Sequence, residues 1–281
     1  MSQPAPIAAG AVSHEDSLQM RRMQERGQSV VVTMYMEAAL AAPVLSSNLI
    51  VDYTSPNAAF PGEFVIVSGH LDSWDIAEGA MDDGGGFVTA LEAVRLLASL
   101  SIFSNRTIRA IGWVDEESGG VGADQYGRDF NDTFASTSFA MESDTGAFGI
   151  YGLSVTAPPA ALAQLRALAP LLAPIGAAQG IELGGDDTDE AVLCSAGVPC
   201  AALWPYDPRA GPAANNPCLP FSATPVPPTM PFSVSDGYML YHHTEADTVD
   251  KMDPAQLQVV AAANAIWAVS IANLPTLLPR V

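Results

Sequence analysis

Short apolar runs and helical repeats of apolar residues alternate along most of this chain. The run at 64–67 (FVIV) is apolar and β-branched, as expected of a buried strand. Further apolar residues then recur every three or four positions, as on one face of a helix; they are Phe87, Ala90, Leu91, Val94 and Leu97. Alternation of this kind predicts an α/β fold with a mostly parallel mixed sheet flanked by helices.

The same patterns extend over the rest of the sequence. The predicted strands are 29–36, 44–53, 64–68, 107–115, 138–142, 149–156 and 198–203. The predicted helices are 15–26, 87–97, 119–130, 158–172 and 253–273, the last with a proline in its first turn. In two segments the apolar residues follow neither the helical nor the strand spacing. We expect residues 1–13 to be frayed, and the Pro- and Asn-rich residues 204–230 to form a long surface loop.

Charge narrows the choice of partners. The 281 residues include 31 acidic and 11 basic side chains, a formal charge of −20. Nucleic acid is therefore not an expected partner, because phosphate binding needs a basic surface. Acidity of this size favours solubility or suits a salty habitat, and part of it is available to bind cations.

Compartment is only weakly constrained by the sequence. No apolar run reaches about 18 residues, so no membrane span is predicted. The first residues lack the basic start and apolar core of a signal peptide. Cys194, Cys200 and Cys218 lack the paired spacing of a structural zinc site. The pairing we consider joins Cys218 to one of the other two, which would indicate an oxidising compartment.

Metal-binding side chains begin where the strand at 64–68 ends. His70 follows that strand, and Asp72 comes two positions later, where its carboxylate can hold the second ring nitrogen of the histidine. Asp82 and Asp83 precede three glycines and the helix at 87–97. Taken alone, these two aspartates are also explained as helix caps. Ligands bind at the carboxyl ends of strands in open α/β sheets, so the location agrees with the chemistry.

Three later segments deliver further donors. Glu116 and Glu117 follow the strand at 107–115, Asp144 follows the strand at 138–142, and His242-His243 precede the last helix. Zinc takes imidazole and carboxylate ligands. Two adjacent glutamates can divide the work, one binding metal and the other accepting a proton from water, although a solvated charge run is the simpler alternative. His14, in a polar stretch, is interpreted as an exposed bystander.

Five motifs, in their order and spacing, resemble those of the M28 family of di-zinc peptidases, in particular its dipeptidases. They are HLDSWD at 70–75, GAMDDGGG at 79–86, WVDEESGGVGA at 113–123, MESD at 141–144 and YHHTEADTVDKMDP at 241–254. The resemblance implies a zinc-exopeptidase (phosphorylase/hydrolase-like) fold and two Zn²⁺ ions as cofactors.

The resemblance also implies roles for individual residues. Two ligand sets share one carboxylate: His70, Asp82 and Asp144 for one ion, and Asp82, Glu117 and His243 for the other. Glu116 matches the general base, and Asp72 matches the partner of the first histidine. The bond from Asp82 to Asp83 matches a non-proline cis peptide. His242 matches no ligand, and it either orients substrate or fills space.

The implied activity is hydrolysis of dipeptides or short peptides by a zinc metalloexopeptidase. Alternatives are an aminopeptidase acting on longer peptides, a non-catalytic relative without metals, and a single-zinc glutaminyl cyclase. The complete ligand set favours the di-zinc hydrolase. By the same resemblance we expect a homodimer in a secretory, extracellular or lysosomal setting. We also expect residues 1–55 to be the remnant of a truncated N-terminal or inserted region, and residues 56–281 to form the catalytic domain.

Overall fold

The computed structural model describes residues 9–37, 39, 41–147, 149–176, 180–184, 188–206, 238 and 241–280. The chain divides into two compact units, Met1–Ser46 and Ser47–Val281. The second unit contains every strand among the described residues and all of the predicted metal donors.

The first unit contains helix α1, His14–Glu25, which confirms the predicted helix there. Ser13 caps it, since the Ser13 hydroxyl accepts the Asp16 amide at 3.1 Å. The predicted strand at 29–36 is wrong, because this segment joins no sheet within the described residues. Val31 and Tyr35 are each 84% exposed. A β-branched run forms a strand only when a neighbouring strand pairs with it.

The second unit is built on a seven-stranded sheet. Its strands are β1 Leu49–Tyr53, β2 Phe60–His70, β3 Arg106–Trp113, β4 Thr137–Glu142, β5 Gly149–Thr156, β6 Gly180–Leu183 and β7 Cys200–Tyr206. They are ordered β1-β3-β2-β4-β7-β5-β6. Only β1 on β3 and β5 on β7 are antiparallel, which confirms the mostly parallel mixed sheet.

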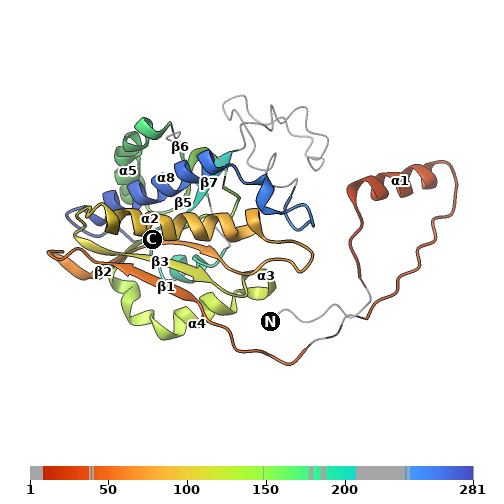
Figure 1. Ribbon diagram of the computed structural model, residues 1–281, viewed down its shortest axis with the longest axis horizontal. Helices are drawn as coiled ribbons and strands as arrows, with labels where there is room; N and C mark the ends of the chain where they lie inside the picture. Colours follow the sequence, from red (N-terminus) through yellow and green to blue (C-terminus); the bar gives the residue numbers. More distant parts are fainter. Residues whose placement is uncertain are drawn as a thin grey trace. The chain divides into compact units, whose positions relative to one another are not determined.

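Helices cover both faces of this sheet (Figure 1). They are α2 Gly85–Ser99, α3 Glu116–Gly119, α4 Val121–Asp129, α5 Pro159–Leu168, α6 Ala191–Cys194 and α8 Pro254–Ala272, with 3-10 turns at Asn131–Ser136, Ala169–Ile175 and Val249–Lys251. Val65 and Val67 point into the core under α2, α5 and α8, whereas Ile66 packs on the opposite side with Trp113 and Tyr126. The alternation follows from the two-residue period of a strand.

Helix α8 is long and apolar enough, by length and composition, to cross a membrane. Half of this apolar stretch is buried inside the unit, where Trp267 and Ile271 belong to the hydrophobic core between the helix and the sheet. We therefore interpret α8 as a core helix, and Asp253 caps its start by accepting the Ala255 amide at 2.8 Å.

The cysteine pairing differs from the one considered. Cys194 and Cys200 form a disulfide, and Cys218 lies outside the described residues. The reason is local: α6 ends at Cys194 and β7 begins at Cys200, and this reversal brings their Cα atoms to 5.7 Å, within disulfide range. Strand β7 runs to Tyr206, so the predicted loop is wrong for residues 204–206, and residues 207–230 lie outside the described part.

A buried arginine fastens the end of α8 to the sheet. Arg106 donates to the carbonyls of Ala272 and Leu274 at 3.0 and 2.6 Å and pairs with Glu63 at 2.7 Å. Its side chain is 1% exposed. A charge so buried is stable only while all of these acceptors are in place.

Arg106→Met should therefore lower the free energy of unfolding by about 3 kcal/mol or more. The substitution removes the positive charge that pairs with Glu63 and leaves two main-chain carbonyls without a donor. Arg95→Met is the matched control, since Arg95 makes only an exposed pair with Glu92, and it should cost less than about 1 kcal/mol. Urea unfolding measures both. Equal losses would contradict the role given to Arg106.

Candidate metal centre

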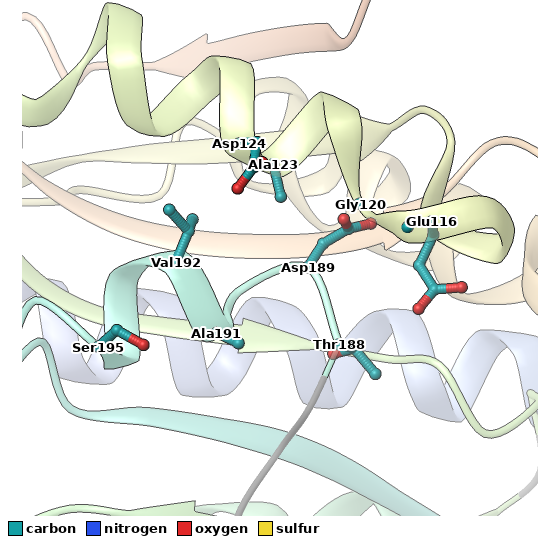
Figure 2. A pocket seen from close by; sticks show the side chains of 10 residues that line it. Glu116, Gly120, Ala123, Asp124, Thr188, Asp189, Ala191, Val192 and Ser195 are labelled. Carbon is teal, nitrogen blue, oxygen red and sulfur yellow. The ribbon is translucent and has the colours of Figure 1, made fainter. Parts of the chain in front are cut away.

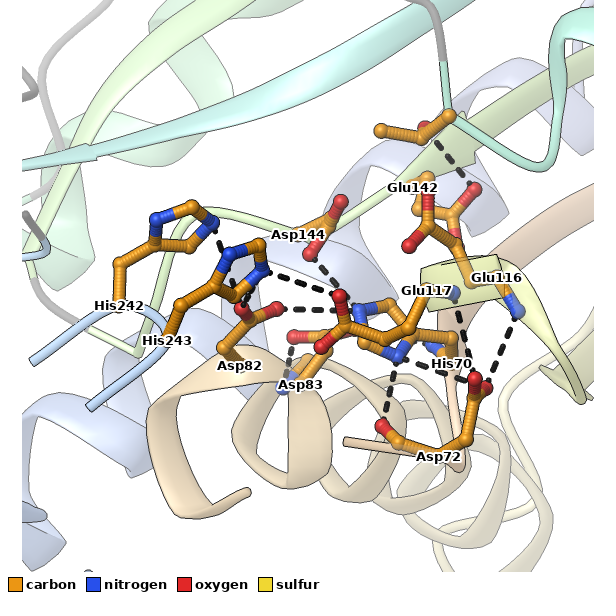
Figure 3. Close-up of polar contacts among 12 residues, drawn as sticks. His70, Asp72, Asp82, Asp83, Glu116, Glu117, Glu142, Asp144, His242 and His243 are labelled. Carbon is orange, nitrogen blue, oxygen red and sulfur yellow. Dashed lines mark hydrogen bonds and ion pairs between the residues drawn. The ribbon is translucent and has the colours of Figure 1, made fainter. Parts of the chain in front are cut away.

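The predicted donors meet at one edge of the sheet, where β2, β3 and β4 end (Figure 3). His70 pairs with Trp113, and Ser68 pairs with Glu142, so the three strands finish side by side. The segments leaving them supply the other donors: Asp82 from the turn before α2, Glu116 and Glu117 from α3, and Asp144 after β4. The carboxyl edge of a parallel sheet is the expected place for a ligand site.

His70 is fully buried between carboxylates. Its Nε2 lies 3.1 Å from Asp82 Oδ1 and 3.1 Å from Asp144 Oδ1. Its Nδ1 lies 2.9 Å from the Asp72 carbonyl oxygen, which can only accept, so Nδ1 is the donor. A neutral His70 then presents an Nε2 lone pair to two carboxylates. That arrangement is stable only with a cation, either a proton or a metal, between them.

A second donor set lies on the other side of Asp82. His243 Nε2 is 3.3 Å from Asp82 Oδ2 and 3.0 Å from Glu117 Oε2. The backbone of His243 is in the left-handed region, with φ 57°. Trp74 stacks on the His243 ring with centroids 4.6 Å apart, which restricts its orientation. The two oxygens of Asp82 thus face different histidines.

The chemistry of these donors fits Zn²⁺. Among the described residues, three groups have donor atoms within 4.8 Å of one another, namely His70–Asp82–Glu117, His70–Asp83–Asp144 and Asp82–His242–His243. Asp82 Oδ2 and Glu117 Oε1 are buried oxygens with no hydrogen-bond partner. Buried carboxylate oxygens are rarely left unpaired. Imidazole with carboxylate is a zinc donor set, so the residues present suit that metal.

The field of the site favours positive charge. Burial alone would lower the pKa of His70, but its hydrogen bonds to Asp144 and Asp82 outweigh burial and raise that pKa to about 12. The carboxylates that hold a proton on His70 so firmly would attract a metal cation in the same way. Burial, reinforced by the charge of Asp144, raises the pKa of Glu116 to about 7, in the range of a general base.

Asp83 supports the donors by accepting main-chain amides. Asp83 Oδ2 accepts the His70 amide at 3.0 Å, and Asp83 Oδ1 accepts the Gly86 amide at 3.1 Å. The peptide bond between Asp82 and Asp83 is cis, as the resemblance implied. Gly86 is required here, because a Cβ on it would lie 1.7 Å from the Ser143 carbonyl oxygen.

Asp72 contacts the site differently from the way its sequence position suggested. The His70 ring donates to the main-chain carbonyl of Asp72, while the nearest contact between that ring and the carboxylate is 3.8 Å. The Asp72 carboxylate instead accepts the amides of Glu116 and Glu117 at 3.1 and 3.2 Å. The side chain is needed at the start of α3, where these amides have no helical acceptor.

Sequence reasoning gave no role to Asp247. Its carboxylate is buried and accepts the amides of Met81 at 2.6 Å and Asp82 at 3.1 Å. It thereby joins the segment that carries His243 to the turn that carries Asp82. The signal was its place in the motif HHTEADT, four residues after His243. His242 lies beside this link, with its ring stacked on His243 at 3.6 Å and its Nε2 3.5 Å from Asp82 Oδ2.

The chain is similar to known proteins over most of its length. The sequence profile of Peptidase family M28 matches residues 48–268. Carboxypeptidase Q of Pongo abelii is 34% identical and that of Homo sapiens 33% identical, each over 276 residues and 98% of this chain. The chain covers 52% of each of these relatives, so it spans about half the length of the curated proteins it matches.

Solved structures share the fold. A crystal structure of a peptidase M28 precursor from Shewanella amazonensis is 27% identical, with a TM-score of 0.77 over 94% of this chain and 53% of that one. A zinc aminopeptidase from Bacillus subtilis is 22% identical, with a TM-score of 0.56 over 79% of this chain and 49% of that one. The second likeness concerns the fold alone.

Asp247→Asn should weaken Zn²⁺ binding by about 10- to 100-fold, because an amide cannot accept both main-chain N–H groups that hold the Asp82 turn. Asp250→Asn, at an exposed carboxylate of the same segment, is the control and should leave the affinity unchanged. Competition with a chromogenic chelator measures the affinity, and circular dichroism checks the fold. Equal affinities for the two variants would show that Asp247 does not position the donors.

The metal-free protein should lose stability as pH rises from about 6.5 to 8. Raised pKa values of about 12 for His70 and about 8 for Asp189 mean that the folded protein binds more protons there than the unfolded chain. The free energy of unfolding then falls with pH, by about 1.4 kcal/mol per pH unit for each such proton. Zn²⁺ replaces the His70 proton, so its stabilising effect should grow over the same range. Urea unfolding with EDTA or with Zn²⁺ tests this, and a metal-free protein that gains stability with pH would contradict it.

Proposed function

The chain belongs to peptidase family M28, and from this membership and the donors around Asp82 we propose that it is a zinc metalloexopeptidase acting on dipeptides or short peptides. The observation that carries the proposal is the position of Asp82, whose Oδ1 lies beside His70 and whose Oδ2 lies beside His243. A carboxylate placed in this way suits a bridge between two metal ions.

In this proposal the residues divide into two ligand sets and one base. His70, Asp82 and Asp144 would hold one Zn²⁺, and Asp82, Glu117 and His243 would hold the other. When bound, the two ions supply Lewis acidity, which polarises the peptide carbonyl and lowers the pKa of water. All of these residues lie within 56–281, the range proposed as the catalytic domain.

Glu116 is the proposed general base. It adjoins Glu117 but is absent from the three donor groups, so its carboxylate remains available for proton transfer. It would accept the proton of the attacking water and deliver it to the leaving amine. Asp72 holds the amides at the start of α3, which fixes the position of both glutamates. Positive charge from bound metal would lower the pKa of Glu116 from about 7, which keeps it ionised at neutral pH.

Relatives named carboxypeptidase Q support cleavage at a chain end. An aminopeptidase acting on longer peptides is the second candidate. Free dipeptides, N-acetylated dipeptides and dipeptide amides distinguish them, because each blocked form removes one terminal charge. The Cys194–Cys200 disulfide supports an oxidising compartment, and we propose a secretory or extracellular setting.

Glu116→Gln should lower kcat by about 10²- to 10⁴-fold while two equivalents of Zn²⁺ stay bound, since the amide cannot accept the proton. Glu92→Gln, on α2 and paired only with exposed Arg95, is the matched control and should keep wild-type activity. Dipeptide hydrolysis and metal analysis of both variants test the proposal. A protein that binds no zinc, or a fully active Glu116→Gln variant, would refute it.

A further inference from the structure

A cavity of about 630 Å³ opens beside Glu116, and none of its described lining residues is a histidine. It lies between α4, which carries Ala123 and Asp124, and the segment at 188–195 (Figure 2). Its volume is in the range of small-molecule sites and is far larger than one water molecule needs. None of the metal donors lines it. The cavity is therefore available for a part of the substrate that does not contact metal.

The notable group in this cavity is the Asp189 carboxylate. The residue is 3% exposed, and neither carboxylate oxygen has a hydrogen-bond partner in the part of the chain that the structure describes. Burial, reinforced by the charge of Glu116, raises the pKa of Asp189 to about 8. A buried carboxylate without a donor is costly, and it is normally compensated by a cation or by hydrogen bonds from a ligand.

The main chain around Asp189 is held firmly. The next residue, Glu190, donates its amide to Glu142 Oε2 at 3.1 Å, and α6 then ends at the disulfide between Cys194 and Cys200. Across the cavity, a Cβ on Gly120 would lie 3.7 Å from Asp189 Oδ1. The Asp189 carboxylate is thus turned toward Gly120, which lines the same cavity. The segment that follows Asp189 is thus anchored to β4 and to the disulfide.

The lining selects a positively charged organic group. Glu116, Asp124 and Asp189 all line the cavity, and none of the described lining residues is a lysine or an arginine. A bare metal ion fits less well, because among the described residues Asp189 belongs to no group of three donors within 4.8 Å. An alkylammonium carries one charge for Asp189 and methylene groups for Ala123, Ala191 and Val192, which also line the cavity.

We propose that this cavity is a subsite for the alkylammonium side chain of a basic residue in the peptide substrate, with Asp189 as the residue that selects the charge. The inference rests on the proposed peptidase function and adds a substrate class to it. Because Glu116 lines the cavity and is also the proposed base, a side chain bound there would hold the scissile bond close to that base.

The test compares dipeptides that differ only in charge: Lys-Ala with norleucine-Ala, and Ala-Lys with Ala-norleucine. In at least one of the two pairs, the wild type should cleave the lysine dipeptide with a kcat/KM about tenfold or more above that of the norleucine dipeptide. Asp189→Asn should reduce this ratio of lysine to norleucine kcat/KM by about tenfold or more. A ratio does not depend on the fraction of folded enzyme. Asp132→Asn removes an exposed charge elsewhere on the unit and should keep the wild-type ratio.

The outcomes separate this inference from the proposed function. Hydrolysis without a lysine preference in either pair would overturn the subsite, and so would an unchanged ratio in Asp189→Asn. An equal loss for lysine and norleucine substrates would mean that Asp189 serves Glu116 or the terminal amine. If no dipeptide is cleaved, calorimetric titration with hexylammonium and with 1-hexanol decides. Binding of the amine alone, lost in Asp189→Asn, supports the subsite, and equal or absent binding overturns it.

Discussion

The crowding of carboxylates around His70 is the constraint on which the rest of the site depends. The buried imidazole commits its Nδ1 proton to a main-chain carbonyl and turns Nε2 toward Asp82 and Asp144. Like charges at this distance in a buried site repel strongly unless a cation lies among them. The fold therefore has to hold the carboxylates against their own repulsion, and it does so through main-chain amides.

Three aspartates fix the segments that carry these carboxylates, and all three do so in the same way. Asp72, Asp83 and Asp247 each accept two main-chain amides. In each pair, at least one amide belongs to a residue that carries a proposed metal donor, namely Glu117 for Asp72, His70 for Asp83 and Asp82 for Asp247, so each aspartate fixes a segment of the site. Asp82 and Glu117, by contrast, each keep one buried oxygen without a donor. Hydrogen bonding thus separates supporting carboxylates from those available to metal.

Much of this arrangement could be predicted from sequence, because its parts are local. Apolar runs indicated the central strands, the residues at their ends indicated the donors, and β5 has the predicted bounds. Contacts distant in sequence could not be read in this way. The strand predicted at 29–36 needed a partner that the described residues lack. The Cys194–Cys200 pairing depends on how α6 meets β7, and β6 is too short at four residues for a periodic pattern.

The same limit explains Asp72, Asp247 and Asp189. Sequence spacing placed Asp72 near His70, but it could not show that the carboxylate turns to α3 and the carbonyl to the ring. Asp247 and Asp189 acquire meaning only through distant residues: the first by accepting amides of the Asp82 turn, the second by lacking any donor beside Glu116. The two aspartates differ in whether the chain supplies hydrogen-bond donors to a buried carboxylate. A buried carboxylate that accepts main-chain amides positions the chain, as Asp247 does. Asp82 and Asp189 have buried oxygens without a donor among the described residues, and we propose that a cation compensates them, a metal ion at Asp82 and the ammonium group of the substrate at Asp189.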